Sequence, residues 1–364
     1  MRIVRITSSV LAIPYEYDGP RHEVGGKAWT TLDILLVRID TEDGLVGWGE
    51  AFGHGAIPAS RAALETLVAP LFVGRDARDI TGTVAAAERS LHLFGRGGPV
   101  TYALSGVEIA LWDLLGKRAG LPLHQMLGGS ARTDLPAYAS LLRYGDPAVV
   151  ARNVAAAVAQ GYRAIKLHEV TVAAVRAARA AAGPDVLLMN DCNCPWPVED
   201  AVAIACALRD QDLHWLEEPV WPPEDWRGLA RVRREGVPIA AGENAGTVAD
   251  FQAAFEAGAL DVAQPSVTKI GGIGAMRRVF AIAAGHGVRV VPHCAYFGPG
   301  FLASLHLAAT LPGPPPMERL FVDLEASPFS PWTEARSGRL AVPLGPGLGC
   351  DPDPAIAERY EVRP

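Results

Sequence analysis

Six short, apolar segments recur in the second half of the 364-residue chain, and each one ends in a polar residue. They read AIKLH, VLLMND, LHWLE, VPIAAGE, DVAQPS and VRVVPH. Their last positions are 168, 191, 217, 243, 266 and 293, so the intervals are 23, 26, 26, 23 and 27 residues. An alanine-rich helical stretch follows each segment. A repeat of strand and helix at this spacing is typical of βα units with parallel strands.

Two further segments extend this series at its ends. LPAYASLL, near 135–142, supplies a strand before the six, and MERLFVDL, near 317–324, supplies one after them. A doubly wound open sheet is the alternative, but it normally carries a glycine-rich phosphate turn after its first strand. No such turn occurs there, and GGIG at 271–274 lacks the full fingerprint. We therefore predict an α/β fold in which residues 126–324 close an eight-stranded barrel.

The first 125 residues have a different pattern, which predicts an α+β domain. Strands are expected near 2–13, 31–40 and 44–51, with Asp43-Gly44 as a hairpin turn between the last two. Helices are expected near 59–70, 82–93 and 103–119. The tail, 325–364, is rich in proline and glycine, and we expect it to fold back and complete this domain.

Composition excludes several classes of partner. The net charge of −7 does not favour binding to nucleic acid or to an anionic membrane surface. No apolar run reaches about 20 residues, the length that a membrane-spanning helix needs, and the N-terminus lacks a signal-peptide cleavage pattern. The five cysteines show no zinc-ribbon spacing. We expect a cytoplasmic protein with reduced thiols.

Three successive strands of the predicted barrel end in carboxylates: Asp191, Glu217 and Glu243. Active sites of such barrels lie at the carboxyl ends of the strands, so these side chains should converge. Clustered carboxylates repel one another unless a cation lies between them, and oxygen ligands favour Mg²⁺ over Zn²⁺. Asn193 is either a neighbour of this site or a turn residue. Glu218 is expected to face away and to form a structural ion pair.

Cationic side chains flank the predicted metal site. Lys166 and His168 share one face of an earlier strand, and His293 ends a later one. A divalent ion and a lysine can hold a substrate carboxylate and stabilise an enediolate as the α-proton leaves. The proton then needs a base on one face and an acid on the other. The two histidines, on opposite sides of the metal strands, fit that requirement.

The whole set of motifs resembles the enolase superfamily, in its mandelate racemase-like group. The resemblance covers nearly the whole chain and rests on GLVGWGEA (44–51), GVEIALWDLLGK (106–117), KLH (166–168), NDCN (190–193), WLEEP (215–219), AGEN (241–244), QPSVTKIGG (264–272), PH (292–293) and MERL (317–320). It implies a modified TIM barrel, (β/α)7β, beneath an N-terminal capping domain. It also implies Mg²⁺-assisted abstraction of a proton α to a carboxylate.

The resemblance also implies roles for individual residues. Asp191, Glu217 and Glu243 would hold Mg²⁺, and Lys166 would contact the substrate carboxylate. His168 stands where many relatives carry a base lysine, and His293 matches a base or acid on the other face. Further matches are Glu318 and Ser140 for substrate binding and Lys269 near the metal carboxylates. Relatives often pair the histidine with an aspartate, but here that place is Ser266, which could orient His293 by a hydrogen bond.

Three reactions are compatible with this chemistry. We favour dehydration of a sugar acid to a 2-keto-3-deoxy acid, with His168 as base and His293 as the acid for the leaving hydroxyl. A cycloisomerase and a racemase or epimerase are the alternatives, followed by a non-catalytic metal-binding relative. The substrate is expected to be a small carboxylate, and the protein a homo-oligomer, from dimer to octamer. We expect specificity to lie in the loops 15–29 and 52–55, where Tyr17, His22 and His54 are the candidate contacts.

Overall fold

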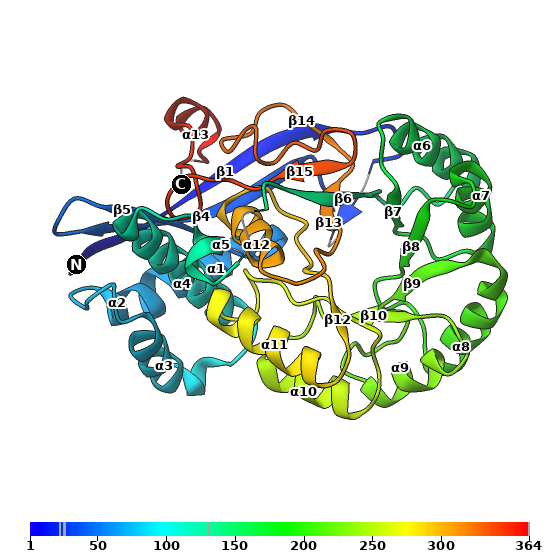
Figure 1. The fold of residues 1–364 in the computed structure, drawn as a ribbon, viewed down its shortest axis with the longest axis horizontal. Coiled ribbons are helices and arrows are strands. Elements are labelled where there is room, and N and C mark those ends of the chain that lie inside the picture. Colours follow the sequence, from blue (N-terminus) through cyan, green and yellow to red (C-terminus); the bar gives the residue numbers. More distant parts are fainter. Residues whose placement is uncertain (22, 25–26, 130–131, 363–364) are drawn as a thin grey trace.

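The structure is a computed structural model that describes residues 1–364 except 22, 25–26, 130–131 and 363–364. Figure 1 shows a sheet with its helices on one side of the molecule and a ring of strands and helices on the other. The strands are β1 (Ile3–Glu16), β2 (Glu23–Val24), β3 (Lys27–Ala28), β4 (Thr31–Thr41), β5 (Val46–Ala51), β6 (Asp134–Ser140), β7 (Ala164–Leu167), β8 (Leu187–Asp191), β9 (Leu213–Glu217), β10 (Ile239–Ala241), β11 (Val262–Ala263), β12 (Arg289–Val290), β13 (Met317–Leu320), β14 (Asp323–Leu324) and β15 (Arg339–Ala341).

The helices alternate with the strands from β6 onward. They are α1 (Ile57–Ala63), α2 (Ala69–Phe72), α3 (Ile80–Ser90), α4 (Pro99–Ala119), α5 (Leu123–Met126), α6 (Pro147–Ala159), α7 (Val172–Ala182), α8 (Val198–Ala207), α9 (Trp226–Arg233), α10 (Val248–Glu256), α11 (Ile273–Gly285), α12 (Pro299–Ala309) and α13 (Pro354–Tyr360). A π-helical turn over 64–68 joins α1 to α2, and short 3₁₀ turns occur at 54–56, 92–94 and 209–211.

The predicted βα repeat is confirmed as a modified barrel. In the described chain, parallel pairing runs in the order β13-β6-β7-β8-β9-β10-β11-β12, with seven helices, α6 to α12, between successive strands. Figure 1 shows α6 to α10 outside the ring of strands. This is the (β/α)7β arrangement, and the open-sheet alternative is wrong.

One side chain from each of the seven segments at β6 to β12 fills the interior of the barrel. This buried layer consists of Tyr138, Ala164, Met189, Trp215, Ala240, Val262 and Val291. Because side chains alternate along a strand, the residue two positions further along also points inward. The residues two positions beyond this core therefore form the next inward-facing layer, nearer the carboxyl ends of the strands. That layer carries the site described below.

The capping part is built on the antiparallel sheet β14-β1-β4-β5. Gly44, with φ +83°, lies in the predicted hairpin turn between β4 and β5. Helix α4 packs on β5, and a Cβ atom at Gly49 would lie 1.9 Å from the carbonyl oxygen of Gly106. Only glycine at position 49 lets the helix approach the sheet this closely.

The tail contacts both parts of the molecule. The backbone N–H of Glu325 donates to the carbonyl oxygen of Pro14 in β1, Glu361 bridges to Leu11, and β15 pairs with β6 of the barrel. The tail therefore folds back as expected but also contacts the barrel, and the boundaries near 125 and 325 stay predictions.

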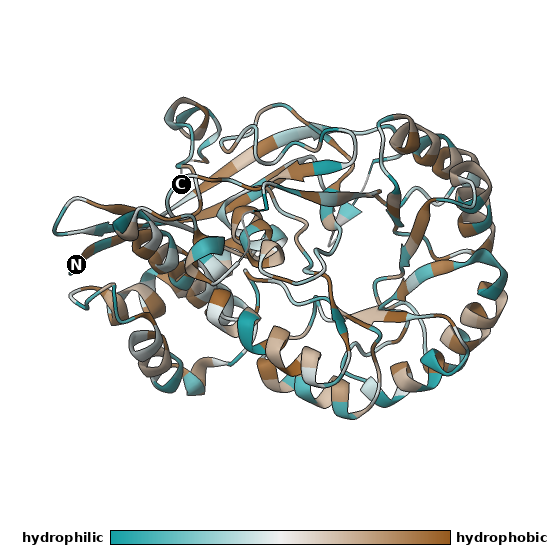
Figure 2. Cartoon of the chain, in the orientation of Figure 1, coloured by the Kyte–Doolittle hydropathy of each residue, from teal (hydrophilic) through white to brown (hydrophobic). Residues whose placement is uncertain are grey.

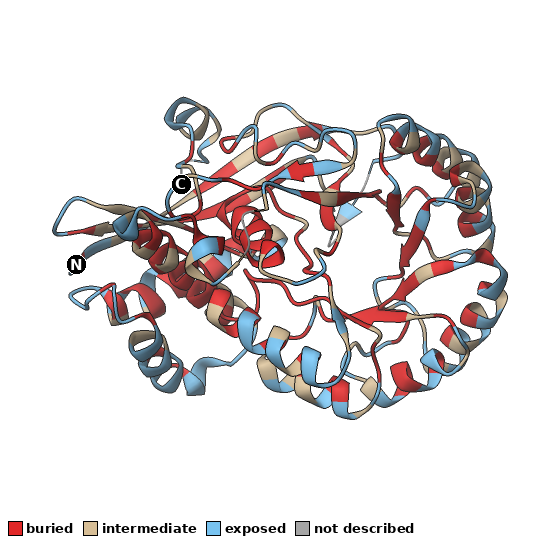
Figure 3. Ribbon diagram, in the orientation of Figure 1, coloured by how far each residue is buried: buried red, intermediate tan, exposed pale blue. Residues whose placement is uncertain are grey.

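Helix α12 lies between the capping part and the barrel, where it contacts β5, α4 and α5. Every residue of α12 is buried, which Figure 3 shows as a fully red helix. The outer barrel helices are instead amphipathic, with hydrophobic residues toward the strands and hydrophilic residues outward (Figure 2). In the described part of the chain, no helix is both long and apolar enough to cross a membrane.

Candidate active site

The layer above the barrel core brings the predicted polar residues together. Ser140, Lys166, Asp191, Glu217, Gln264 and His293 each lie two positions beyond a residue of that core. Strand β10 is the exception, because its corresponding residue is Gly242. The φ of +135° at Gly242 turns the chain, and Glu243 follows it into the site.

Asp191, Glu217 and Glu243 form the predicted cluster, and their ligand oxygens all lie within 4.8 Å of one another. Asp191 and Glu217 are buried, whereas the Glu243 side chain is 18% exposed. Burial and the neighbouring charge of Asp191 raise the pKa of Glu217 well above its usual value. The buried Oδ2 of Asp191 accepts no well-directed hydrogen bond in the described chain. An all-oxygen donor set of three carboxylates suits a hard divalent cation such as Mg²⁺.

Neighbouring groups hold the metal carboxylates in place. Trp215 Nε1 and Gln264 Nε2 donate hydrogen bonds of 2.9 and 2.8 Å to Oε2 of Glu217. The backbone N–H of Asn193 donates to Oδ1 of Asp191 at 2.9 Å. Trp215 and Gln264 were not predicted as site residues, although Gln264 lies two positions beyond Val262 and so falls in the site layer.

Lys166 supplies a fixed positive charge beside these carboxylates. Its Nζ lies 2.8 Å from Glu217, 3.0 Å from Asp191 and 3.3 Å from Glu318. Burial alone would favour the neutral amine, but the three carboxylates raise the pKa of Lys166 well above its usual value. Lys166 is therefore an ammonium ion in this arrangement and not a base.

His168 lines the cavity and has a defined tautomer. Its Nδ1 donates a hydrogen bond to the carbonyl oxygen of Leu141, which leaves the lone pair on Nε2. Nε2 lies 3.4 Å from Oδ2 of Asp191. Lys166 and His168 thus reach the same metal carboxylate from one strand, as predicted, and His168 is the member of the pair that can accept a proton.

His293 lies beside the third carboxylate. Its Nε2 is 2.8 Å from Oε2 of Glu243 and 4.0 Å from Glu318, while its buried Nδ1 has no hydrogen-bond partner in the described chain. The prediction that Ser266 orients this ring is wrong. The Ser266 hydroxyl lies 3.0 Å from the hydroxyl of Tyr296, which donates to the backbone carbonyl of His293.

The substrate contacts predicted from the resemblance lie behind Lys166. Ser140 Oγ donates a 2.8 Å hydrogen bond to Oε1 of Glu318, and the backbone N–H of Cys294 donates to Oε2. Both side chains are buried, and neither is among the residues that line the cavity. In this structure Ser140 therefore positions Glu318.

Two further charged residues, Lys269 and Glu218, lie near the cluster. Lys269 Nζ lies 4.7 Å from the centre of the Phe52 ring, and its charge helps to lower the pKa of Glu243. The prediction of a structural ion pair at Glu218 is wrong. Asn244 Nδ2 and Cys194 Sγ donate hydrogen bonds to this carboxylate, and within the described chain no cation lies at ion-pair distance from it.

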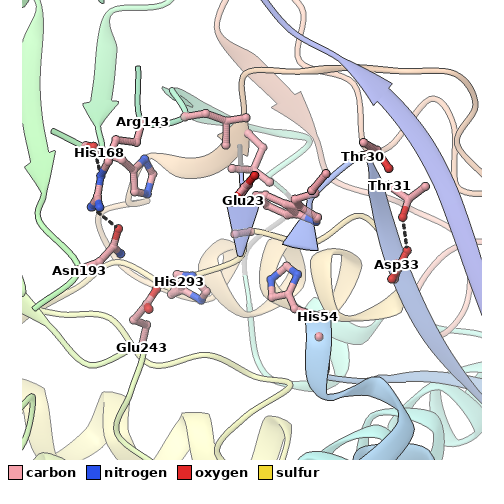
Figure 4. Close-up of a pocket in the computed structure, with 16 residues that line it drawn as sticks. Glu23, Thr30, Thr31, Asp33, His54, Arg143, His168, Asn193, Glu243 and His293 are labelled. Carbon is pink, nitrogen blue, oxygen red and sulfur yellow. Dashed lines mark hydrogen bonds and ion pairs between the residues drawn. The ribbon is translucent and has the colours of Figure 1, made fainter. Parts of the chain in front are cut away.

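A cavity of about 490 Å³ opens over the cluster, between the barrel and the capping part (Figure 4). The barrel contributes Arg143, His168, Asn193, Glu243 and His293, among others, and the capping part contributes Glu23, Trp29, Thr30, Thr31, Asp33 and His54. His54 therefore lies where the sequence predicted. Tyr17 lines a different hollow, where its ring lies against Tyr144. His22 lies outside the described residues.

Arg143 is a cavity residue that the sequence analysis missed. Its Nε donates to the carbonyl oxygen of His168 at 2.8 Å, and its Nη2 donates to the carbonyl of Cys192 and to Oδ1 of Asn193, each at 3.0 Å. Figure 4 shows this guanidinium beside His168 and Asn193. Arg143 thereby ties together the ends of β7 and β8, which carry the predicted base and a predicted metal ligand.

Comparison with known proteins gives matches along most of the chain. Residues 149–356 match the enolase C-terminal domain-like family, and residues 18–128 match the N-terminal domain family of mandelate racemase and muconate lactonizing enzyme. A D-galactarolactone cycloisomerase from Agrobacterium fabrum is 34% identical over 341 residues, which cover 87% of this chain and 88% of that protein. An arabinonate dehydratase from Saccharolobus solfataricus is 30% identical over 352 residues, with 93% and 94% covered.

A solved structure is similar over its entire length. The crystal structure of a racemase from Streptomyces coelicolor with bound magnesium has a TM-score of 0.85 and 32% identity, and the match covers 99% of this chain and 100% of that chain.

Proposed function

Because the chain belongs to the enolase superfamily, in its mandelate racemase-like group, we propose that it removes the proton α to the carboxylate of a sugar acid. The proposed outcome is β-elimination of water through an enediolate, which gives a 2-keto-3-deoxy acid. The observation that carries this proposal is the convergence of three carboxylates and an ammonium ion beneath a cavity that two histidines line.

Asp191, Glu217 and Glu243 are the proposed Mg²⁺ ligands. A bound Mg²⁺ would neutralise the substrate carboxylate and stabilise the negative charge that develops as the α-proton leaves. The Lys166 ammonium adds a second positive charge that needs no rearrangement during the reaction. It is fixed by the three carboxylates around it.

The two histidines supply the proton transfers in this proposal. His168 accepts the α-proton on Nε2, since its Nδ1 is committed to the Leu141 carbonyl. His293, which reaches the cavity from beside Glu243, protonates the leaving oxygen. Figure 4 shows the two rings at separate positions along the cavity wall, so that a substrate between them can meet both.

Cycloisomerisation is a second candidate, favoured by the 34% identity to the D-galactarolactone cycloisomerase. The two reactions share the α-proton step and differ in the leaving oxygen. In an open-chain acid the oxygen leaves as water, whereas an oxygen within a ring stays attached to the product. The same residues can therefore serve either reaction.

The test is exchange of the α-hydrogen in D₂O, followed by NMR across a library of acid sugars with Mg²⁺ present. We expect exchange or conversion of at least one acid, and mass spectrometry then separates loss of water from an unchanged mass. Chelation of divalent ions should abolish the reaction, and Mg²⁺ should restore it. Absence of exchange with every acid tested would contradict the proposal.

Replacement of one ligand tests the metal assignment separately. Glu217→Gln should weaken Mg²⁺ binding, measured by calorimetry, and abolish exchange, because the cluster loses a charged oxygen donor. Glu199→Gln, which removes a surface partner of Arg231, is the matched control and should bind Mg²⁺ as the unmodified protein does. Equal Mg²⁺ affinity for both variants would rule out Glu217 as a ligand.

A further inference from the structure

The two sides of the cavity carry opposite kinds of polar group. The barrel side carries Arg143, His168 and His293 beside the metal carboxylates. The capping side carries hydrogen-bond acceptors and hydroxyls, contributed by Glu23, Thr30, Thr31 and Asp33. Figure 4 shows Thr31 and Asp33 across the cavity from His168 and Asn193, with Glu23 and His54 between them.

Asp33 is the most constrained of these acceptors. Thr31 and Asp33 lie on the same face of β4, and Oγ1 of Thr31 donates a 2.7 Å hydrogen bond to Oδ1 of Asp33. The residue is only partly exposed, and burial raises the pKa of its carboxyl group. A poorly solvated carboxylate of this kind is stabilised by hydroxyl donors and destabilised by another anion nearby.

The described lining residues of the capping side include few groups that could neutralise an anion. His54 is the basic group described there, and burial lowers its pKa to about 4, so that its ring is neutral at pH 7. Among the cavity-lining side chains that the structure describes on the capping side, none is positively charged at neutral pH. Among the described side chains that line the capping side, the far end of a bound substrate would therefore meet Asp33, Glu23 and two threonine hydroxyls.

We propose that this cavity selects a sugar acid with one carboxylate and a neutral, hydroxyl-bearing tail, and that Asp33 discriminates against a second carboxylate at the far end. The single carboxylate binds at the barrel side, and tail hydroxyls donate to Asp33 and exchange hydrogen bonds with Thr31. A diacid of the same length and stereochemistry would place a negative charge beside Asp33. This inference rests on the proposed function, since it names the substrate class of the same site.

The experiment compares matched pairs of six-carbon acids, each an aldonate and the aldarate of the same configuration, by α-hydrogen exchange in D₂O with Mg²⁺. We expect kcat/KM for the monoacid of the best pair to exceed that for the diacid by about tenfold or more, because like charges brought together across an interface are strongly disfavoured. Preference for the diacid would overturn this inference and leave the proposed function standing. No exchange with any acid would overturn both.

Variants then test whether Asp33 sets the preference. Asp33→Asn should reduce the monoacid-to-diacid ratio about tenfold, mainly through a lower KM for the diacid. Glu16→Gln removes a carboxylate of the capping part that lies outside this cavity, and it should leave the ratio unchanged. Equal ratios in the unmodified protein and in Asp33→Asn would show that Asp33 does not discriminate. The monoacid-to-diacid ratio of the unmodified protein tests the inference without any variant. The inference can therefore be contradicted even if Asp33→Asn folds poorly.

Discussion

The chemistry of the site depends on a division between Lys166 and His168, two residues apart on one strand. Lys166 is surrounded by carboxylates that keep it charged, so it contributes a fixed field. His168 lies nearer the cavity and keeps a lone pair on Nε2 because Leu141 takes the proton of Nδ1. In the proposed reaction His168 is therefore the base, and Lys166 is not.

Arg143 is predicted to position this base. Arg143→Met should lower kcat about 10- to 100-fold with little change in KM, because three hydrogen bonds from a charged donor to the ends of β7 and β8 are lost. Each such bond contributes about 1.5–3 kcal/mol, and 1.4 kcal/mol corresponds to about tenfold in rate. Steady-state kinetics on an accepted sugar acid is the measurement.

The control for this prediction is Arg152→Met. Arg152 pairs with Asp18 on the exposed surface and does not line the cavity. Arg143→Lys should recover part of the lost rate, since lysine keeps the charge but makes fewer directed bonds. An unchanged kcat in Arg143→Met would mean that the neighbouring loops hold His168 without its help.

At the scale of elements, the strand repeat predicted most of the site. The spacing of the apolar segments predicted the barrel, and the convergence of strand ends in such a barrel predicted that Asp191, Glu217 and Glu243 lie together. Contacts across loops were beyond such reasoning. Ser266 bonds Tyr296 instead of the His293 ring, because both residues lie in loops beyond β11 and β12, where tertiary packing sets the partners of a side chain.

Arg143 and Asp33 were missed for related reasons. Arg143 acts through backbone carbonyls of other strands, and such acceptors leave no trace in the sequence. Asp33 lies near the start of a strand in the capping part, and its position across from the metal cluster depends on how that part packs on the barrel. Tertiary packing decides both contacts.

Strand β5 and helix α12 are joined by a buried acid. Oε2 of Glu50 accepts a 2.8 Å hydrogen bond from the backbone N–H of Gly300, in the first turn of α12. Burial raises the pKa of Glu50 to about 8, although backbone N–H groups of Gly300 and Gly298 partly oppose this. The folded protein therefore holds a proton that the unfolded chain, with a pKa of about 4.3, has already released at neutral pH.

Glu50→Gln should remove a pH dependence of stability. A carboxyl pKa that is raised on folding gives full stability below the unfolded pKa, and stability is lost as the pH rises toward 8. From pH 5 to pH 8, the unfolding free energy of the unmodified protein should fall by about 3 kcal/mol more than that of Glu50→Gln. The expected slope is about 1.4 kcal/mol per pH unit. Urea denaturation at both pH values measures this difference.

The control is Glu358→Gln, on the exposed face of α13. Its unfolding free energy should follow that of the unmodified protein at both pH values. If Glu50→Gln also ran parallel to the unmodified protein, the carboxyl of Glu50 would be ionised in the fold at neutral pH.

At the scale of the whole molecule, three parts of the chain meet at a buried histidine pair. His124 lies on α5 and His306 on α12, with their rings stacked at a centroid distance of 5.2 Å and their Nδ1 atoms 3.0 Å apart. Nε2 of His306 donates to the carbonyl oxygen of Leu348 in the tail, 3.1 Å away. With that proton on Nε2, Nδ1 of His306 is an acceptor for His124, so the arrangement requires the His306 ring to be neutral.

Protonation of this pair should weaken the assembled fold in acid. Burial lowers the pKa of His306 to about 3, so between pH 6.5 and 3 the unfolded chain binds a proton that the folded protein does not, and stability falls as the pH falls. From pH 7.5 to pH 5, His306 should account for a loss of about 2 kcal/mol in unfolding free energy. His306→Gln should reduce this loss, whereas His92→Gln, at an exposed histidine, should retain it. Urea denaturation at both pH values measures this loss. An equal loss of unfolding free energy in His306→Gln and in the unmodified protein would show that protonation of His306 does not destabilise the fold.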